Sequence, residues 1–214
     1  WAWAALFFDI DNDGDDDLFM TNGLTDYNTA WQHRLHPDRR DWFYPVSHIG
    51  ESNMLFRNDD GVLRMPSEIS GAELSGRNSR ALALLDYDRD GDLDMAISTF
   101  HSKARLFRND VANEEAGNWI QIELVGDPEQ GVNRDAIGAQ LTIRSSSGLY
   151  VWRAVTGGEG YLGMNSLPVE VGLGAATAVD IAIDWPGMQR QRHEHVAANQ
   201  RIRIHKAGQV LEPW

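Results

Sequence analysis

A nine-residue acidic pattern occurs twice in this chain and restricts how it can fold. The first copy runs from Asp9 to Asp17 and the second from Asp86 to Asp94, and both follow D-x-D-x-D-G-x-x-D. Carboxylates packed this densely repel one another, so the loops need a neutralising cation to form a tight turn. Because short apolar runs flank both copies, each loop is expected to connect two β-strands.

A second string also repeats and sets the length of the unit. Leu-Phe-Arg-Asn-Asp begins at Leu55 and again at Leu106, 51 residues apart, whereas the acidic loops begin 77 residues apart. The difference indicates an insertion in the first unit, at about residues 24–50. A period near 50 with short apolar runs and Gly/Asp turns is typical of four-stranded, propeller-like units.

Alternating aspartates supply an oxygen-rich set of metal donors. Side chains at loop positions 1, 3 and 5 gather on one side, glycine at position 6 permits the bend, position 7 offers its carbonyl, and position 9 closes the shell. Hard oxygen donors in this number favour Ca²⁺ over Zn²⁺ or Mg²⁺. The pattern argues against an EF-hand, because position 12 is Met20 or Ile97 instead of glutamate. The plainer alternative is a polar turn that binds no ion.

The second half of the chain alternates between apolar and polar residues, which predicts half-buried β-strands. The alternating segments are 118–125, 139–144, 149–155, 179–185 and 201–205. Turns are predicted between them at 131–133, 145–148, 157–158 and 172–174. Trp119, Trp152 and Trp185 fall within the strands and are expected in the core. These features predict a β-sandwich of roughly 100 residues.

Composition excludes several classes of protein. The net charge of −13 argues against a nucleic-acid partner, because phosphate binding needs a basic surface. No apolar run approaches the ~20 residues of a membrane-spanning helix, so membrane insertion is not expected. Cysteine is absent, which excludes disulfides and thiolate metal sites.

The two acidic loops resemble the calcium-binding loops of FG-GAP (VCBS-type) repeats, which form the blades of integrin-α-like β-propellers. The resemblance implies one structural Ca²⁺ in each loop, two sites in all. The side-chain ligands it implies are Asp9, Asp11, Asp13 and Asp17 in the first loop, and Asp86, Asp88, Asp90 and Asp94 in the second. Asp15 and Asp92 would each contribute a backbone carbonyl.

The second half resembles the ASPIC/UnbV domain, which follows FG-GAP repeats in the cartilage acidic protein-like family. The matching strings are Asn118-Trp119-Ile120, Asn133 to Ala139, Gly172-Leu173-Gly174, Asp184-Trp185-Pro186 and Asn199-Gln200. The chain departs from the family at Trp185-Pro186-Gly187, where it is one residue shorter. Because the role of the family is poorly defined, the resemblance implies architecture more than activity.

The expected organisation is therefore all-β. We predict a partial β-propeller of about two FG-GAP blades in residues 1–112, with the insertion at about 24–50, followed by an antiparallel β-sandwich in residues 117–210. Two blades do not close a propeller, which takes ~4–8. We therefore expect upstream blades in a longer chain, or assembly with copies of the same chain.

The function expected from these features is calcium-dependent, non-catalytic recognition or adhesion. The resemblance and the calcium loops imply a secreted, periplasmic or cell-surface protein with a protein or carbohydrate partner. The alternative is an enzyme or accessory protein of a biosynthetic pathway, as suggested for some UnbV-type relatives. No nucleophile elbow, phosphate loop or dinucleotide fingerprint occurs, so no catalytic residue is assigned. Candidate partner-binding residues are the aromatics of the insertion, Tyr27, Trp31, Trp42 and Tyr44, unless the insertion buries them in its own small core.

Overall fold

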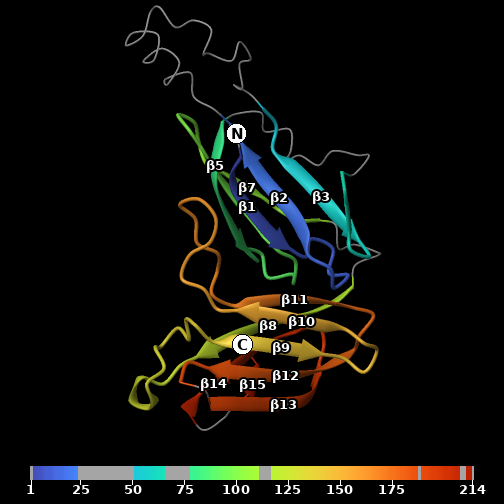
Figure 1. Cartoon of the computed structure of the whole chain (residues 1–214), viewed down its shortest axis with the longest axis vertical. Coiled ribbons are helices and arrows are strands. Elements are labelled where there is room, and N and C mark those ends of the chain that lie inside the picture. Colours follow the sequence, from blue (N-terminus) through green and yellow to red (C-terminus); the bar gives the residue numbers. More distant parts are fainter. Residues whose placement is uncertain are drawn as a thin grey trace, which may run out of the picture.

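The structure is a computed structural model that describes residues 2–23, 51–65, 78–110, 117–187, 189–207 and 211–213. These residues form four β-sheets, two at each end of an elongated molecule (Figure 1). Helical structure in the described residues is confined to short 3₁₀ turns such as η4 (Pro128–Gln130). In this part of the chain, none of the helices has the length and apolar character needed to cross a membrane. The prediction of an all-β chain is confirmed.

The first two sheets repeat one design. The strands of the first sheet, in spatial order, are β1 (Ala2–Phe8), β2 (Asp17–Asn22), β3 (Met54–Asp59) and β4 (Val62–Arg64). The strands of the second are β5 (Ser79–Leu85), β6 (Asp94–Thr99) and β7 (Arg105–Phe107). All neighbours are antiparallel, and in each sheet the acidic loop joins the first two strands.

These two sheets share one hydrophobic core, to which each contributes a cross-strand row of apolar side chains. The row from the first sheet is Leu6, Phe19 and Leu55. The row from the second sheet is Leu84, Met95 and Phe107. Burying such side chains stabilises the pair of sheets by ~1.5–3 kcal/mol for each large residue.

The two rows come from opposite faces of the repeated unit. Aligning the acidic loops makes Leu84 the counterpart of Phe7, one residue away from Leu6. Leu84 is 4% exposed in the shared core, whereas Phe7 lies on the outer face of the first sheet and is 63% exposed. The units therefore stack in one direction, the front of one against the back of the other, as successive units of a repeat protein do.

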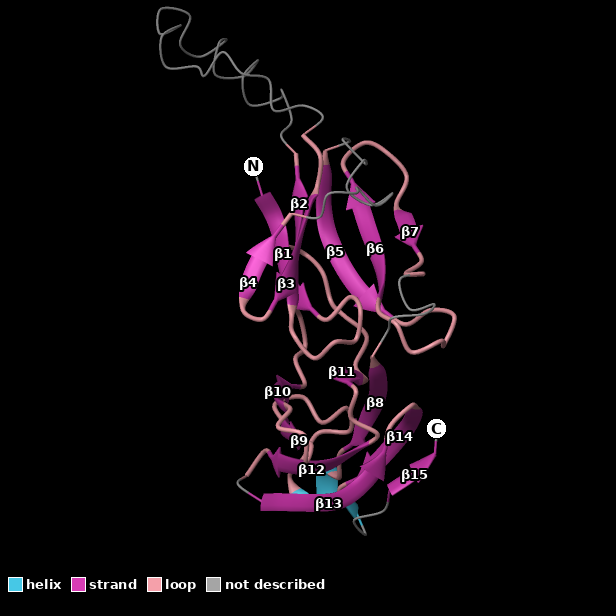
Figure 2. Cartoon of the chain, turned by 90° about the vertical axis from the view of Figure 1, so that its right-hand side faces the viewer, coloured by secondary structure: helices cyan, strands magenta, loops and turns pink. Residues whose placement is uncertain are grey.

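The remaining strands form a β-sandwich around a separate core. One sheet, in spatial order, consists of β10 (Tyr150–Ala154), β9 (Gln140–Arg144), β12 (Ala178–Trp185) and β13 (Gln189–Ala197). The other consists of β11 (Val169–Gly174), β8 (Asn118–Val125), β14 (Gln200–His205) and β15 (Leu211–Pro213). Figure 2 shows the two sheets as separate layers. Ile122, Leu141 and Ile181 are among the side chains completely buried between them.

The five strands predicted from alternation are confirmed as β8, β9, β10, β12 and β14. Strands β11, β13 and β15 were not predicted, and the turn predicted at 172–174 is wrong because these residues belong to β11. The sandwich also contains one parallel pair, β8 with β14, among otherwise antiparallel neighbours. Parallel pairing is possible here because long stretches of chain separate the two strands.

The three tryptophans expected in the core have different environments. Trp185 is 2% exposed, as predicted, and Trp119 is half-buried. The prediction is wrong for Trp152, which is 51% exposed on the outer face of β10. Both faces of this strand carry apolar residues in the sequence, so alternation alone does not say which face is buried. Val151 is buried in the core, and Trp152 lies on the opposite, exposed face.

The stacking direction of the first two sheets is tested by replacing each of two equivalent residues, Leu84 and Phe7, with alanine. We expect Leu84→Ala to destabilise the 214-residue chain by ~2–4 kcal/mol, because it leaves a cavity in the shared core. Phe7→Ala should change stability by less than ~1 kcal/mol, because its ring is largely in solvent. Chemical denaturation measures both, and a larger loss for Phe7→Ala would contradict the stacking.

Candidate metal centres

Both acidic loops lie at the ends of their sheets that face the sandwich (Figure 1). In the first loop, Asp9, Asp11 and Asp17 each place a carboxylate oxygen within 4.8 Å of the other two. In the second loop the residues at the same positions, Asp86, Asp88 and Asp94, do the same. The structure thus brings together positions 1, 3 and 9 of both copies of the pattern.

The position-1 carboxylate organises the bend of each loop. Asp9 Oδ2 accepts a hydrogen bond from the backbone N–H of Gly14 at 2.9 Å, and Asp86 Oδ2 accepts the equivalent bond from Gly91 at 3.2 Å. Both glycines have positive φ, +103° and +100°, which an L-amino acid adopts only with strain. The glycine at position 6 is therefore required by the backbone, as the sequence pattern predicted.

The position-9 aspartate fastens the loop to two strands. Asp17 accepts the backbone N–H groups of Ile10 (2.8 Å) and Asn58 (2.7 Å). The equivalent donors to Asp94 are Tyr87 (2.7 Å) and Asn109 (2.8 Å). Because the same two bonds form in each loop, four in all, the two loops are attached to their strands in the same way.

The repeated Leu-Phe-Arg-Asn-Asp string is part of both centres, which the sequence analysis did not foresee. Its asparagine supplies the backbone N–H to position 9, as described above. Its arginine faces position 3, because Arg57 forms an ion pair with Asp11, and Arg108 lies 3.6 Å from Asp88. The acidic loop and the Leu-Phe-Arg-Asn-Asp string occur together twice, which could have indicated that they lie together in the structure.

The remaining loop aspartates lie outside the three-residue clusters. Asp13 Oδ1 accepts the backbone N–H of Asp15 at 2.8 Å, and Asp90 Oδ1 accepts that of Asp92 at 3.1 Å. These bonds help to fix the loop backbone and involve only the Oδ1 atoms of Asp13 and Asp90. A role in metal binding for positions 5 and 7 stays a prediction.

Burial makes Asp9, Asp17 and Asp92 difficult to ionise without a cation. It raises the pKa of Asp9 to about 7 and the pKa of Asp17 to about 6, with further increases from neighbouring aspartates, while backbone N–H hydrogen bonds act in the opposite direction. In the second loop, burial and the Asp90 carboxylate raise the pKa of Asp92 to about 6. A bound divalent cation would favour the ionised forms.

The donor set fits Ca²⁺. Both clusters consist of carboxylates, the hard oxygen ligands that this ion prefers. Asp11 Oδ1 is shielded from solvent and has no hydrogen-bond partner among the described residues, so it retains capacity to accept a cation. The two loops also contact each other, since Asn12 Nδ2 donates to Asp92 Oδ1 at 2.7 Å.

The first loop packs directly against β11 of the sandwich. The backbone N–H of Gly174 donates to the carbonyl of Asn12 at 2.9 Å. A Cβ at Gly172 would collide with the Asp9 carboxylate and with the backbone of Asn12. Glycine is therefore needed at position 172 for close approach to the loop, and not for a turn as predicted.

The second loop contacts the sandwich through Trp119 and Arg201. The indole of Trp119 lies against Gly91, where a Cβ would have no room. Arg201 of β14 pairs with Asp86, the Nη2–Oδ2 distance being 3.0 Å, and the Asp86 side chain is completely buried. Trp119 and residues 172–174 belong to the strings that carry the ASPIC/UnbV resemblance, so these strings lie at the contact with the acidic loops.

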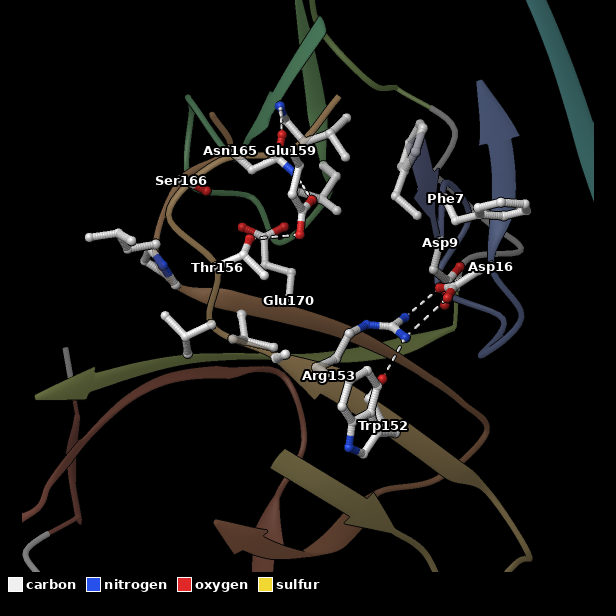
Figure 3. Close-up of a pocket in the computed structure, with 18 residues that line it drawn as sticks. Phe7, Asp9, Asp16, Trp152, Arg153, Thr156, Glu159, Asn165, Ser166 and Glu170 are labelled. Carbon is white, nitrogen blue, oxygen red and sulfur yellow. Dashed lines mark hydrogen bonds and ion pairs between the residues drawn. The ribbon is translucent and has the colours of Figure 1, made fainter. Parts of the chain in front are cut away.

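A cleft of about 400 Å³ lies beside the first loop, between the small sheets and the sandwich (Figure 3). Arg153 pairs with Asp16 through two contacts, one of which measures 3.0 Å. Glu159 accepts a hydrogen bond from Asn165 Nδ2 at 2.6 Å. Glu170 also lines the cleft, and burial raises its pKa to about 8. These groups come from strands and loops that the sequence analysis did not associate.

The aromatic candidates of the insertion lie outside the described residues. These are Tyr27, Trp31, Trp42 and Tyr44. Their role in partner binding stays a prediction.

The contact between loop and sandwich can be tested at one glycine. We expect Gly172→Ala to destabilise the chain by ~1–3 kcal/mol, because the added methyl group displaces the Asp9 carboxylate. Gly158→Ala is the matched control, since a Cβ there would meet only ordinary contacts. Equal melting temperatures for the two variants would contradict the contact.

The raised pKa values predict an unusual pH dependence for the metal-free chain. A carboxyl group whose pKa is higher in the folded state binds protons more tightly there, so folding loses stability as pH rises from about 4 to about 7. We expect the melting temperature in chelator to fall over this range by on the order of 5 °C, at ~2–4 °C per kcal/mol. Asp9→Asn should flatten the slope, and a melting temperature that rises with pH in chelator would contradict this account.

Comparison with known proteins identifies part of the chain. Residues 129–210 match the family model described as ASPIC and UnbV. No curated protein is similar enough to the chain to count as a match. The matched residues run from η4 to the segment before β15. Residues 129–210, in the C-terminal part of the chain, are thus similar to the ASPIC/UnbV family.

Proposed function

We propose that this chain is a calcium-stabilised, non-catalytic recognition module, in which two FG-GAP-type blades support an ASPIC/UnbV domain. The observation that carries the proposal is the duplicated centre, in which carboxylates at the same three positions lie together, and those at positions 1 and 9 accept the same three backbone hydrogen bonds in each loop. The ions would be structural, because they would fix the loops on which the sandwich rests.

Arg57 and Arg108, the arginines of the repeated string, are weak substitutes for a metal ion. The side chains of Arg57 and Arg108 are 42% and 54% exposed, so water screens much of their charge. Arg57 pairs with the position-3 carboxylate of its loop, and Arg108 divides its contacts between the position-3 carboxylate and Asp110. Ca²⁺ would neutralise several carboxylates at once, which supports a metal as the main counter-charge.

The proposed location is outside the cell or in the cell envelope. Structural calcium loops of extracellular modules bind with affinities of ~10⁻⁴–10⁻³ M, which suits compartments rich in this ion. The proposed partner is a protein or a carbohydrate. The outer face of the first sheet, which includes the exposed Phe7, corresponds to the face that the second sheet buries in the shared core. This correspondence supports further blades in a longer chain.

An enzyme is the second candidate, because a carboxyl group with a strongly raised pKa in a cleft is typical of acid–base catalysts. Glu170 is that group. However, its Oε2 atom is shielded from solvent and its Oε1 atom accepts a hydrogen bond from Gln121, which does not favour proton transfer to a substrate in the cleft. We therefore favour the non-catalytic function.

Removal of calcium tests the proposal. We expect millimolar Ca²⁺ to raise the melting temperature above its value in chelator, because a ligand that binds only the folded state stabilises it. Asp17→Asn and Asp94→Asn should each reduce this increase, since each removes one ligand from one loop. Asp135→Asn is the control, because Asp135 lies outside the acidic loops and forms an exposed ion pair with Arg134. Identical melting of the unmodified chain with and without Ca²⁺ would overturn the calcium proposal.

A further inference from the structure

The outer face of the sheet β10-β9-β12-β13 has the features of a binding surface. In Figure 1 this sheet faces the viewer, and Figure 2 shows the other sandwich sheet on its opposite side. Strand register places Trp152, Thr142, Ala182 and Arg192 in one row across the face. The row begins with a large aromatic residue, continues over two small side chains and ends with an arginine.

Two large aromatic side chains on this face are exposed. Tyr150 is 58% exposed and Trp152 is 51% exposed, and both lie on β10 with one residue between them. The Arg144 guanidinium lies 4.9 Å from the centre of the Tyr150 ring, which helps to hold that ring in place. Neighbouring exposed aromatic residues on a sheet of a soluble protein are typical of a recognition site.

A hollow of about 320 Å³ lies on the same face. Its floor includes the small residues Thr142 and Ala182, and longer side chains such as Arg144, Arg190 and Arg192 surround them. Such a hollow has room for one or two rings of a small ligand at the floor, with polar groups at its rim.

The charges on this face balance, although the whole chain carries −13. The charged residues on or around the hollow are Arg144, Arg190, Arg192, Asp180, Asp184 and Glu194. Arg190 and Asp184 form a two-point ion pair with N–O distances of 2.7 and 2.6 Å. A face without net charge does not favour a polycation or a polyanion. It offers hydrogen-bond donors beside acceptors, which suits hydroxyl groups that both donate and accept.

We propose that this face binds a neutral oligosaccharide, with one sugar ring packed on Trp152 and the next over Thr142 and Ala182. Sugar rings have an apolar C–H face, which packs on an indole, and hydroxyl edges, which hydrogen-bond to charged and polar side chains. Arg192 and Asp180 are placed at the rim to make such bonds. This inference rests on the proposed recognition function and names its surface and ligand class.

The test measures binding of the calcium-loaded chain to immobilised neutral hexasaccharides derived from cellulose, xylan, chitin and mannan. We expect at least one to bind. Trp152→Ala should weaken this binding at least tenfold, and Thr142→Trp should abolish it by filling the hollow. Phe7→Ala is the control, because it removes an exposed aromatic residue of the first small sheet that does not line the hollow. Unchanged melting temperatures of the two face variants establish that they are folded.

Three outcomes would overturn the inference. The first is no binding of the unmodified chain to any of the hexasaccharides. The second is equal binding by the Trp152→Ala and Phe7→Ala variants. The third is binding confined to a polyanion such as heparin. A melting temperature independent of calcium, together with loss of glycan binding in Trp152→Ala, would overturn the calcium proposal and support the glycan-binding surface.

Discussion

Repulsion among buried carboxylates is the constraint on which this structure depends. Each acidic loop brings three aspartate side chains within 4.8 Å of one another, and the burial of Asp9 and Asp17 makes their ionisation costly. Backbone N–H groups orient these carboxylates but carry no net charge. The proposed Ca²⁺ ions would remove the repulsion and convert each loop into a rigid connection.

The rest of the molecule is arranged around these loops. The two small sheets stack front to back, which places both loops at the same end, and the sandwich rests on them through Gly172, Trp119 and Arg201. A buried ion pair between Arg201 and Asp86 joins the two parts and is sensitive to the geometry of the second loop. Stability of the loops and attachment of the sandwich are therefore linked.

The sequence predicted the features that local patterns determine. The acidic loops, the strands around them and five sandwich strands follow from residue spacing and alternation. Features that depend on tertiary contacts were not predicted. Gly172 contacts Asp9, which is distant in sequence, so residue spacing does not reveal this contact and indicates a turn instead. Trp152 was placed in the core because both faces of β10 are apolar enough to be buried.

The most direct test of the central claim is the number of Ca²⁺ ions bound per chain, measured by equilibrium dialysis at millimolar free calcium. The account predicts two ions for the unmodified chain, and one for each of the single variants Asp17→Asn and Asp94→Asn. Zero bound ions for the unmodified chain, with the fold intact, would show that protons and arginines alone neutralise the loops, and would contradict the account.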